Sequence, residues 1–238
     1  MILTPGRYQP VVNLKDTVCK DTDTYDEEER LLIPCYDDFY NTAVAIIPFQ
    51  SDRELRILDL GPGSGILSEK LARRYSRAQF TLIDGSASRL GKAEIRLSPK
   101  YSDRISYRYK NVAESPLKGT FDLVVSALCI HNLSDKEKRS LYTKIFKQLE
   151  PGGIFIHCDK VLGENAFAER LYRRLWLASV QVTGIEEHRL QQVLERMQDE
   201  QKSPLSRQLQ WLEKIGFSDI TTWYQYYNFV VFSGTKIV

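Results

Sequence analysis

Glycines recur at every second position in the segment ILDLGPGSGILSEKLARRY, which begins at residue 57. Asp59 is followed by Gly61, Gly63 and Gly65, after an apolar run and before a helical pattern. Glycine allows a tight backbone turn and lets a ligand approach the main chain. The helix that follows offers unpaired N–H groups and a partial positive charge. The segment therefore predicts a loop that faces the anionic part of a ligand.

Two kinds of phosphate-binding loop fit this segment poorly. The dinucleotide pattern G-x-G-x-x-G, begun at Gly61, requires a glycine where Ile66 stands. A P-loop ends in Gly-Lys-Ser/Thr, whereas here Gly65 is followed by Ile66 and Leu67. Phosphate cradling and a nicotinamide dehydrogenase are therefore disfavoured.

Histidine gives the second chemical signal. His131 comes directly after the apolar run 121–130, and histidine titrates near neutrality, which suits proton removal from a phenol or an ammonium group. The alternative is that His131 only packs, or caps the chain before Asn132. His157 and Asp159 stand near the end of a later strand, where a histidine is more often structural. We expect no metal, because nothing in the spacing of these residues requires one.

A strand–helix alternation positions these residues. The expected strands cover residues 55–60, 78–84, 105–109, 121–130 and 152–161. The expected helices cover residues 64–75, 86–98 and a segment that begins with a capping box of Ser134 and Glu137. This order predicts βαβ units and a parallel sheet. Ligands bind such sheets at the carboxyl ends of the strands, where the glycine loop and the histidines stand.

Two helical segments lie outside this alternation. Residues 26–47 have a helical pattern that breaks at Pro34, and residues 163–202 predict two further helices. The second segment is far longer than the usual connection of about 2–6 residues, and such insertions serve as lids or binding elements. We expect residues 1–50 to close over the ligand, and residues 51–238 to form the core that carries the insertion.

The end of the chain predicts a helix and a hairpin. Ser203 is the expected N-cap, Pro204 the expected first helical residue, and Gly216 the expected end. The segments DITTWYQYY and NFVVFSGTKIV then read as two strands. No crossover helix separates them, so they must pair as an antiparallel hairpin.

The composition bounds the class of protein. The chain has 238 residues and a net charge of +2, from 33 Lys and Arg against 31 Asp and Glu. This balance lacks the basic excess of a dedicated nucleic-acid binder, so no nucleic-acid partner is expected. No apolar stretch approaches the roughly 20 residues that cross a bilayer, and the N-terminus shows no signal peptide. We expect a cytoplasmic protein with Cys19, Cys35, Cys129 and Cys158 as free thiols.

Residues 55–161 resemble the class I S-adenosylmethionine (SAM)-dependent methyltransferases. In that family an acidic residue precedes G-x-G-x-G, as Asp59 does, and a second one ends strand two, as Asp84 does. LEPGG at 149–153 matches the turn into the fifth strand, and the terminal hairpin matches the antiparallel seventh strand. The resemblance implies an α/β, Rossmann-like fold with a seven-stranded, mostly parallel sheet and a helical lid. It also implies SAM as cofactor and S-adenosylhomocysteine (SAH) as product.

The same resemblance implies the cofactor contacts. Asp84 would accept hydrogen bonds from both ribose hydroxyls, because a carboxylate accepts and does not donate. Asn111 stands where the family usually has an aspartate that binds the adenine amino group, and the N–H of Val112 would bind a ring nitrogen. Residues 126–128 would line the methionine portion. The implied cofactor residues are Tyr36, Asp59, Gly61, Pro62, Gly63, Asp84, Gly85, Asn111, Val112, Ser126, Ala127 and Leu128.

Both ends of the chain are similar to a narrower subgroup, which includes the carboxy-SAM synthases and nearby small-molecule methyltransferases. The segments YDEEERLLIPCYDDFY and WYQYYNFVVFSGTK carry this likeness. In the subgroup a tyrosine two residues after the helix-breaking proline covers the cofactor, and here it is Tyr36. The carboxy-SAM synthases also use an arginine to hold the extra carboxylate. Ungapped counting from Trp223 places Val193 there, and this departure favours ordinary methyl transfer. Arg189 and Arg196 lie nearby, so a shifted helix could still supply the arginine.

These observations predict an enzyme that transfers a methyl group from SAM to an O, N or C atom of a small molecule. His131 is the expected catalytic base, and Tyr40, Asp159 and Tyr226 are the expected acceptor-binding residues. A helical lid favours a small acceptor, and we expect a monomer or a homodimer with no membrane partner. Two alternatives stay open: a carboxy-SAM synthase-like enzyme of tRNA wobble-uridine modification, and a SAM-binding protein without catalysis.

Overall fold

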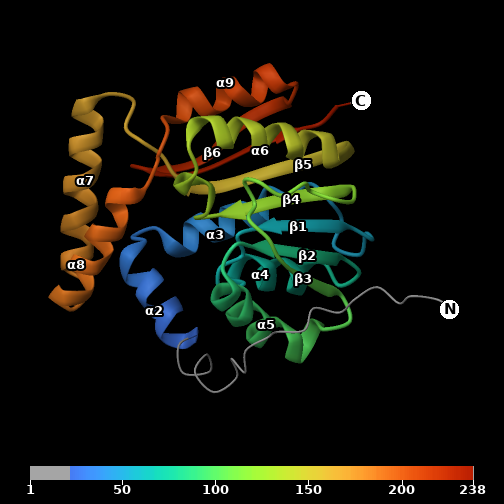
Figure 1. Cartoon of the computed structure of the whole chain (residues 1–238), viewed down its shortest axis with the longest axis horizontal. Coiled ribbons are helices and arrows are strands. Elements are labelled where there is room, and N and C mark those ends of the chain that lie inside the picture. Colours follow the sequence, from blue (N-terminus) through green and yellow to red (C-terminus); the bar gives the residue numbers. More distant parts are fainter. Residues whose placement is uncertain (1–21, 238) are drawn as a thin grey trace.

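A seven-stranded sheet runs through the centre of the molecule (Figure 1). The computed structural model describes residues 22–237, so Cys19 and the first part of the expected N-terminal segment lie outside the described residues. The strands are β1 (Arg56–Leu60), β2 (Gln79–Asp84), β3 (Ile105–Tyr109), β4 (Phe121–Ala127), β5 (Leu149–Lys160), β6 (Ser218–Tyr226) and β7 (Phe229–Thr235). Their order is β3-β2-β1-β4-β5-β7-β6. The first five strands are parallel, and β7 runs antiparallel to β5 and β6, which confirms the predicted fold.

Helices cover both faces of this sheet because its strands are apolar on both sides. Successive side chains of a strand point to opposite faces. Ile57 accordingly belongs to one hydrophobic core and Leu58 to the other, and both are fully buried. The first core includes residues of α3 (Tyr36–Ala45), α4 (Ile66–Arg74) and α5 (Ala87–Tyr101), and the second includes residues of α6 (Asp135–Gln148) and α9 (Leu205–Ile215).

Local sequence signals set several element ends, with two corrections. The predicted capping box of Ser134 and Glu137 begins α6, and Gly216 ends α9 in the left-handed conformation. The strand expected at 121–130 ends at Ala127, because the chain turns at Leu128 (φ 50°) into the short 3-10 helix η1 (Ile130–Asn132). The N-cap of α9 is Pro204 instead of Ser203, whose hydroxyl bonds to Asp135 and Lys138.

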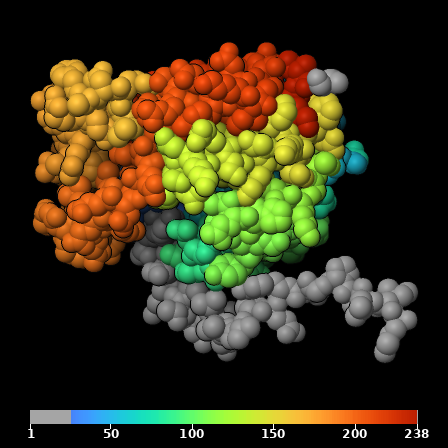
Figure 2. All heavy atoms as spheres, turned by 45° about the horizontal axis from the view of Figure 1, so that its top comes forward, coloured from blue at the N-terminus to red at the C-terminus, as the bar shows by residue number. Residues whose placement is uncertain are grey.

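The predicted insertion forms a helical lobe at one end of the molecule, as Figure 2 also shows. It contains α7 (Ala166–Gln181), α8 (Glu187–Arg196) and the 3-10 helix η2 (Met197–Asp199). The indole Nε1 of Trp176 donates to the backbone oxygen of Leu32, 2.8 Å away, at the end of α2 (Thr22–Leu32). The insertion and the N-terminal helices thus contact each other. Among residues 22–237, no helix is long and apolar enough to span a bilayer.

Candidate cofactor and acceptor site

The glycine loop joins β1 to α4 in left-handed backbone conformations. Gly61, Gly63 and Gly65 have φ angles of 71°, 58° and 85°, which glycine adopts without the steric cost that a Cβ brings. At Gly61 space is also limiting, because a Cβ there would lie 2.2 Å from the Sγ of Cys129. The loop therefore requires glycine at this position for two independent reasons.

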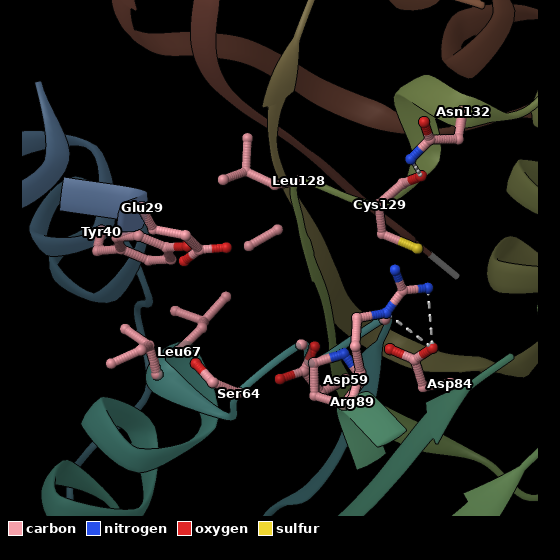
Figure 3. Close-up of a pocket in the computed structure, with 15 residues that line it drawn as sticks. Glu29, Tyr40, Asp59, Ser64, Leu67, Asp84, Arg89, Leu128, Cys129 and Asn132 are labelled. Carbon is pink, nitrogen blue, oxygen red and sulfur yellow. Dashed lines mark hydrogen bonds and ion pairs between the residues drawn. The ribbon is translucent and has the colours of Figure 1, made fainter. Parts of the chain in front are cut away.

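A first cavity, with an empty volume of about 540 Å³, lies against this loop (Figure 3). The predicted cofactor residues that line it are Asp59, Gly61, Pro62, Gly63, Asp84, Ala127 and Leu128. Tyr40, which was predicted to bind the acceptor, lines this cavity as well, together with Glu29 of α2. The first cavity thus combines the carboxyl ends of β1, β2 and β4 with the N-terminal helices.

The remaining predicted cofactor residues lie outside this lining. Tyr36 is buried, and Arg30 lies over its ring. Gly85 lies next to Asn111, whose side-chain oxygen accepts the backbone N–H of Ala113 at 3.0 Å. The hydroxyl of Ser126 is buried and donates to the backbone oxygen of Leu60 (2.7 Å), and so it joins β4 to β1. Val112 packs in the second hydrophobic core.

Asp59 presents an unsatisfied carboxylate oxygen at the first cavity. Its side chain is buried (1% exposed); Oδ2 accepts the hydroxyl of Ser68 at 2.6 Å, and Oδ1 has no hydrogen-bond partner among the described residues. Burial raises the pKa of Asp59 to about 7, the charge of Asp84 adds to the rise, and the hydrogen bond from Ser68 opposes it. A buried acceptor without a donor is costly, so a cationic or hydrogen-bond-donating ligand fits this position.

Asp84 and Arg89 also line the first cavity. Oδ1 of Asp84 accepts the backbone N–H of Ser86 (2.7 Å) and lies 3.3 Å from both Nε and Nη2 of Arg89. Arg89 also lines a second cavity, as do Glu29, Leu128 and Asn132. The two cavities are therefore contiguous.

Helix α2 is fastened to the glycine loop by Asp26. The hydroxyl of Ser64 donates to Oδ1 of Asp26 at 2.6 Å, and Arg96 pairs with the same carboxylate. Arg96 also donates to the backbone oxygen of Ser64 at 2.7 Å and pairs with Glu69 at 3.2 Å. Contacts between partly buried groups hold α2 beside the first cavity.

The second cavity lies beneath the insertion and has an empty volume of about 1010 Å³. His131 and Asn132 contribute from η1, and Lys160 contributes from β5. Its other lining residues are Glu28 and Leu32 of α2 and the following Ile33, Trp176, Val193, Arg196, Met197 and Glu200 of the insertion, and Asn228 and Phe229 of the hairpin. A third cavity shares Trp176, Met197 and Asn228 with the second.

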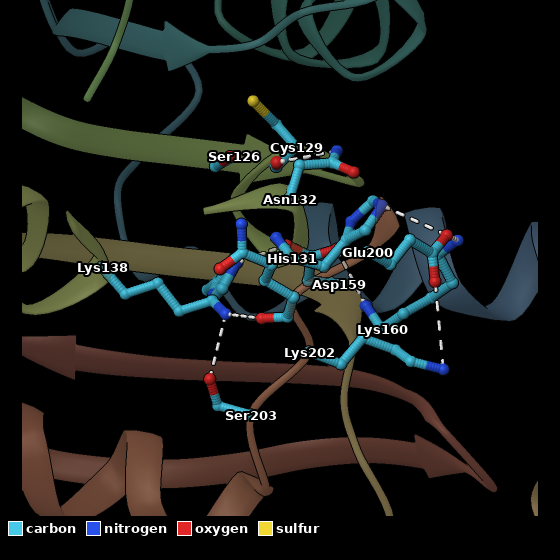
Figure 4. Close-up of polar contacts among 12 residues, drawn as sticks. Ser126, Cys129, His131, Asn132, Lys138, Asp159, Lys160, Glu200, Lys202 and Ser203 are labelled. Carbon is cyan, nitrogen blue, oxygen red and sulfur yellow. Dashed lines mark hydrogen bonds and ion pairs between the residues drawn. The ribbon is translucent and has the colours of Figure 1, made fainter. Parts of the chain in front are cut away.

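His131 is held by the buried carboxylate of Asp159 (Figure 4). Oδ2 of Asp159 accepts the backbone N–H of His131 (2.8 Å) and lies 2.9 Å from Nε2 of His157, and Oδ1 lies 2.6 Å from Nδ1 of His131. Burial alone would raise the pKa of Asp159, but the charges and hydrogen bonds of the two histidines outweigh it and lower that pKa. Since an ionised carboxylate only accepts, Nδ1 of His131 carries a proton, and Nε2 faces Oε1 of Glu200 at 3.5 Å.

Two of the predicted acceptor residues, Asp159 and Tyr226, are not among the residues that line these cavities. Asp159 is buried behind His131 and lines none of the three cavities described here, so its contact is to the histidine. Tyr226 also lies outside their linings, and its ring packs 4.5 Å from that of Tyr227. Among residues 22–237, no group of three or more His, Cys, Asp or Glu could hold a metal ion.

Sequence reasoning missed Glu29, Arg89, Glu200 and Asn228. Glu200 stands in the charged stretch QDEQK, which is typical of a solvated loop, and Asn228 stands in a hairpin turn, where asparagine is common for structural reasons. Neither position carries a chemical signal. Arg89 follows Asp84 by five residues on the adjoining helix, which was the available hint.

Comparisons with known proteins point to one family. Residues 57–153 match a family model described as a methyltransferase domain. A carboxy-S-adenosyl-L-methionine synthase of Nautilia profundicola is 21% identical over 214 residues, 89% of this chain and 90% of that protein. A malonyl-[acyl-carrier protein] O-methyltransferase of Bacillus cytotoxicus is 29% identical over 115 residues, 48% of this chain and 38% of that protein.

The fold is also found in solved structures. Human N-acetylserotonin methyltransferase in complex with SAM matches with a TM-score of 0.59 and 16% identity, over 97% of this chain. The present chain spans 61% of that structure, which is less than two thirds of its length. At this identity the likeness concerns the fold alone.

Proposed function

We propose that this chain, a member of the class I SAM-dependent methyltransferases, binds SAM in the first cavity and methylates a small molecule in the second. The observation that carries the proposal is the continuity of the two cavities through Glu29, Arg89, Leu128 and Asn132. A methyl donor and an acceptor need such continuity, because methyl transfer depends on in-line positioning and exclusion of water.

The residues of the first cavity suit the parts of SAM. When bound, SAM supplies an activated methyl group on a sulfonium, which leaves as a neutral thioether. Oδ1 of Asp59 would accept a hydrogen bond from the cationic amino-acid portion. Asp84 would bind the ribose hydroxyls after giving up its contacts with Arg89. Tyr40 and Glu29 would cover the ligand from the N-terminal helices. The insertion would keep water out of the second cavity, and its cover favours a small acceptor over nucleic acid.

His131 is the proposed general base. Asp159 holds the proton on Nδ1, so Nε2 is left to receive a proton from an acceptor hydroxyl or ammonium group. Asp159 is a positioning residue, because it contacts His131 and does not line the second cavity. His157 contacts Asp159 and so acts on His131 only through that carboxylate. This arrangement is required only for acceptors that are protonated at the working pH.

The second candidate function is a carboxy-SAM synthase-like reaction, favoured by relatives such as that of Nautilia profundicola over most of the chain. The expected position of the carboxylate-binding arginine is Val193, which is buried and lines the second cavity. Arg196 lines it too, but is exposed and pairs with Glu28 at 3.6 Å. An apolar wall at Val193 supports methyl transfer over retention of a carboxylated cofactor.

Native mass spectrometry of the purified protein, followed by denaturing analysis of any released ligand, tests the proposal. Release of SAM or SAH is the expected result and would justify a screen of acceptors. Release of carboxy-SAM would favour the second candidate. If the protein is purified empty, calorimetry with SAM replaces this step, and an absence of binding at millimolar SAM would exclude the assignment. Tight binding with no turnover of any acceptor would indicate a SAM-binding protein without catalysis.

The raised pKa of Asp59 predicts that SAM affinity depends on pH. A cationic ligand prefers the ionised carboxylate, so affinity should fall by up to about tenfold per pH unit below about 7. Because folding raises the pKa of Asp59, protonation of this group stabilises the ligand-free folded state at low pH. This contribution to the free energy of unfolding is lost as the pH rises from about 4 to about 7. Calorimetry from about pH 5.5 to 8 should show proton release on binding. Asp59→Asn should remove the slope, and an unchanged slope in this variant would contradict the assignment.

A further inference from the structure

Two residues that line the second cavity each have a buried side-chain oxygen without a hydrogen bond among the described residues. The side chain of Glu200 is 6% exposed and its Oε2 has no hydrogen-bond partner among the described residues. Asn228 is also 6% exposed, and its Oδ1 is likewise without a partner in residues 22–237. Both residues line the second cavity. Since a buried acceptor without a donor is costly, these atoms suit a ligand that brings N–H or O–H groups.

Glu200 is held in place by a dedicated set of contacts (Figure 4). The backbone N–H of Gln201 donates to the backbone oxygen of His131 at 3.0 Å. Lys138, which is 1% exposed, donates to the backbone oxygen of Gln201 and, at 2.9 Å, to the hydroxyl of Ser203. Oε1 of Glu200 accepts from Lys160. The segment is therefore fixed against η1 and α6. Oε2 of this preorganised carboxylate has no hydrogen bond among the described residues, and Nζ of Lys202 lies 3.9 Å from it.

The charges around the second cavity disfavour an anionic acceptor. Each cation that lines it already has a carboxylate partner. Arg89 pairs with Asp84 (3.3 Å), Lys160 pairs with Glu200, and Arg196 pairs with Glu28 (3.6 Å). An anion would have to break one of these pairs, whereas a donor would complete the hydrogen bonding of Glu200 without breaking any.

We propose that the acceptor is an amine- or hydroxyl-bearing molecule with an aromatic or apolar body, and that Glu200 Oε2 and Asn228 Oδ1 bind its donors. This inference rests on the proposed function and adds the chemical class of the acceptor. Trp176, Val193 and Phe229 supply apolar walls for the body. A longer body can continue into the third cavity, which shares Trp176 and Asn228. Carboxylates and phosphates are excluded as the recognised head group.

Three probes of nearly the same shape test this inference on the full chain with saturating SAH. Tyramine, 4-ethylphenol and 4-hydroxyphenylacetate share a phenol and differ in a cationic, an apolar or an anionic end. By ligand-observed NMR titration, tyramine should bind at least about tenfold tighter than 4-hydroxyphenylacetate. Glu200→Gln should weaken tyramine binding by about tenfold and strengthen binding of the carboxylate, because Lys160 loses its charged partner. Glu195→Gln, on the exposed part of α8, is the matched control and should change neither value.

The outcomes separate this inference from the proposed function. If 4-hydroxyphenylacetate binds as tightly as tyramine, if tyramine does not bind at about 10 mM, or if Glu200→Gln leaves the ratio unchanged, the inference is wrong. SAH affinity is measured on the same samples. If SAH binds normally but the probe affinities do not follow the expected order, only the inference about the acceptor is wrong. If SAH does not bind, the proposed function is wrong as well. Asn228→Ala replaces Glu200→Gln if the latter does not fold, and should also weaken tyramine binding.

Discussion

Replacing Gly61 by alanine is expected to weaken SAM binding by about a hundredfold or more. The new Cβ would lie 2.2 Å from Sγ and 2.5 Å from Cβ of Cys129, at a φ of 71°. Left-handed strain costs about 1–2 kcal/mol, and overpacking adds about 1–3 kcal/mol. Because Cys129 directly precedes η1, relief of this collision must displace either the glycine loop or the turn that carries His131. Calorimetry with SAM measures the loss.

Two other glycines separate the causes of this effect. Gly184 has a φ of 80°, but no atom lies within 4 Å of an added Cβ, so Gly184→Ala introduces strain without collision. Gly91 in α5 has neither problem, and Gly91→Ala should stabilise the helix by roughly 0.5–1 kcal/mol. Neither control should alter SAM affinity. Affinity in Gly61→Ala within about threefold of the parent protein would refute the fit of the loop to the cofactor.

Loss of the Asp159 carboxylate is expected to have the largest effect on stability. Asp159→Asn should lower the free energy of unfolding by about 3–5 kcal/mol at neutral pH. The reason is that the buried side chains of His131 and His157 lose the negative charge of the carboxylate that they contact. Since the pKa of Asp159 is lowered on folding, its contribution is present above the ordinary value of 3.8 and is lost as pH falls below it. Urea unfolding at several pH values should therefore show the two proteins converging in acid.

The same variant tests the positioning of the base. With an acceptor that needs proton removal, Asp159→Asn and His131→Gln should each lower kcat by about 10²–10⁴-fold and leave SAM affinity unchanged. Asp103→Asn on the surface is the control and should stay within about 0.5 kcal/mol in stability. A normal kcat in His131→Gln would mean that the acceptor needs no base, and a normal stability in Asp159→Asn would contradict the buried network.

The elements of the sheet were predictable because each carries a local signal. Apolar strands that alternate with helical patterns give βαβ units, and the hairpin follows from the missing crossover. The contact of His131 with Asp159 was harder to predict from the sequence, because the two residues are 28 positions apart. It depends on β4 and β5 being neighbours, with Ala127 beside Cys158. Once that pairing is given, both residues follow at the same sheet edge.

Some side-chain positions did not follow from the sequence, because they depend on the direction in which each side chain points. Tyr36 and Tyr40 are one helical turn apart and both buried, yet Tyr40 lines the first cavity and Tyr36 does not. No periodicity distinguishes them, because residues four apart share a face. Ser126 lies one residue before the end of β4, but its side chain points to the backbone of β1. Glu200 depends on the path of a long insertion, which no local pattern specifies.

Arg89 belongs to the walls of both cavities and is tied to Asp84 from one side. A ligand that takes over Asp84 in the first cavity must therefore change the charge and shape of the second. Such linkage is reciprocal in free energy, so occupancy by an acceptor would alter cofactor affinity by the same factor. In kinetic terms, this single side chain would couple the binding of cofactor to the binding of acceptor in the proposed enzyme.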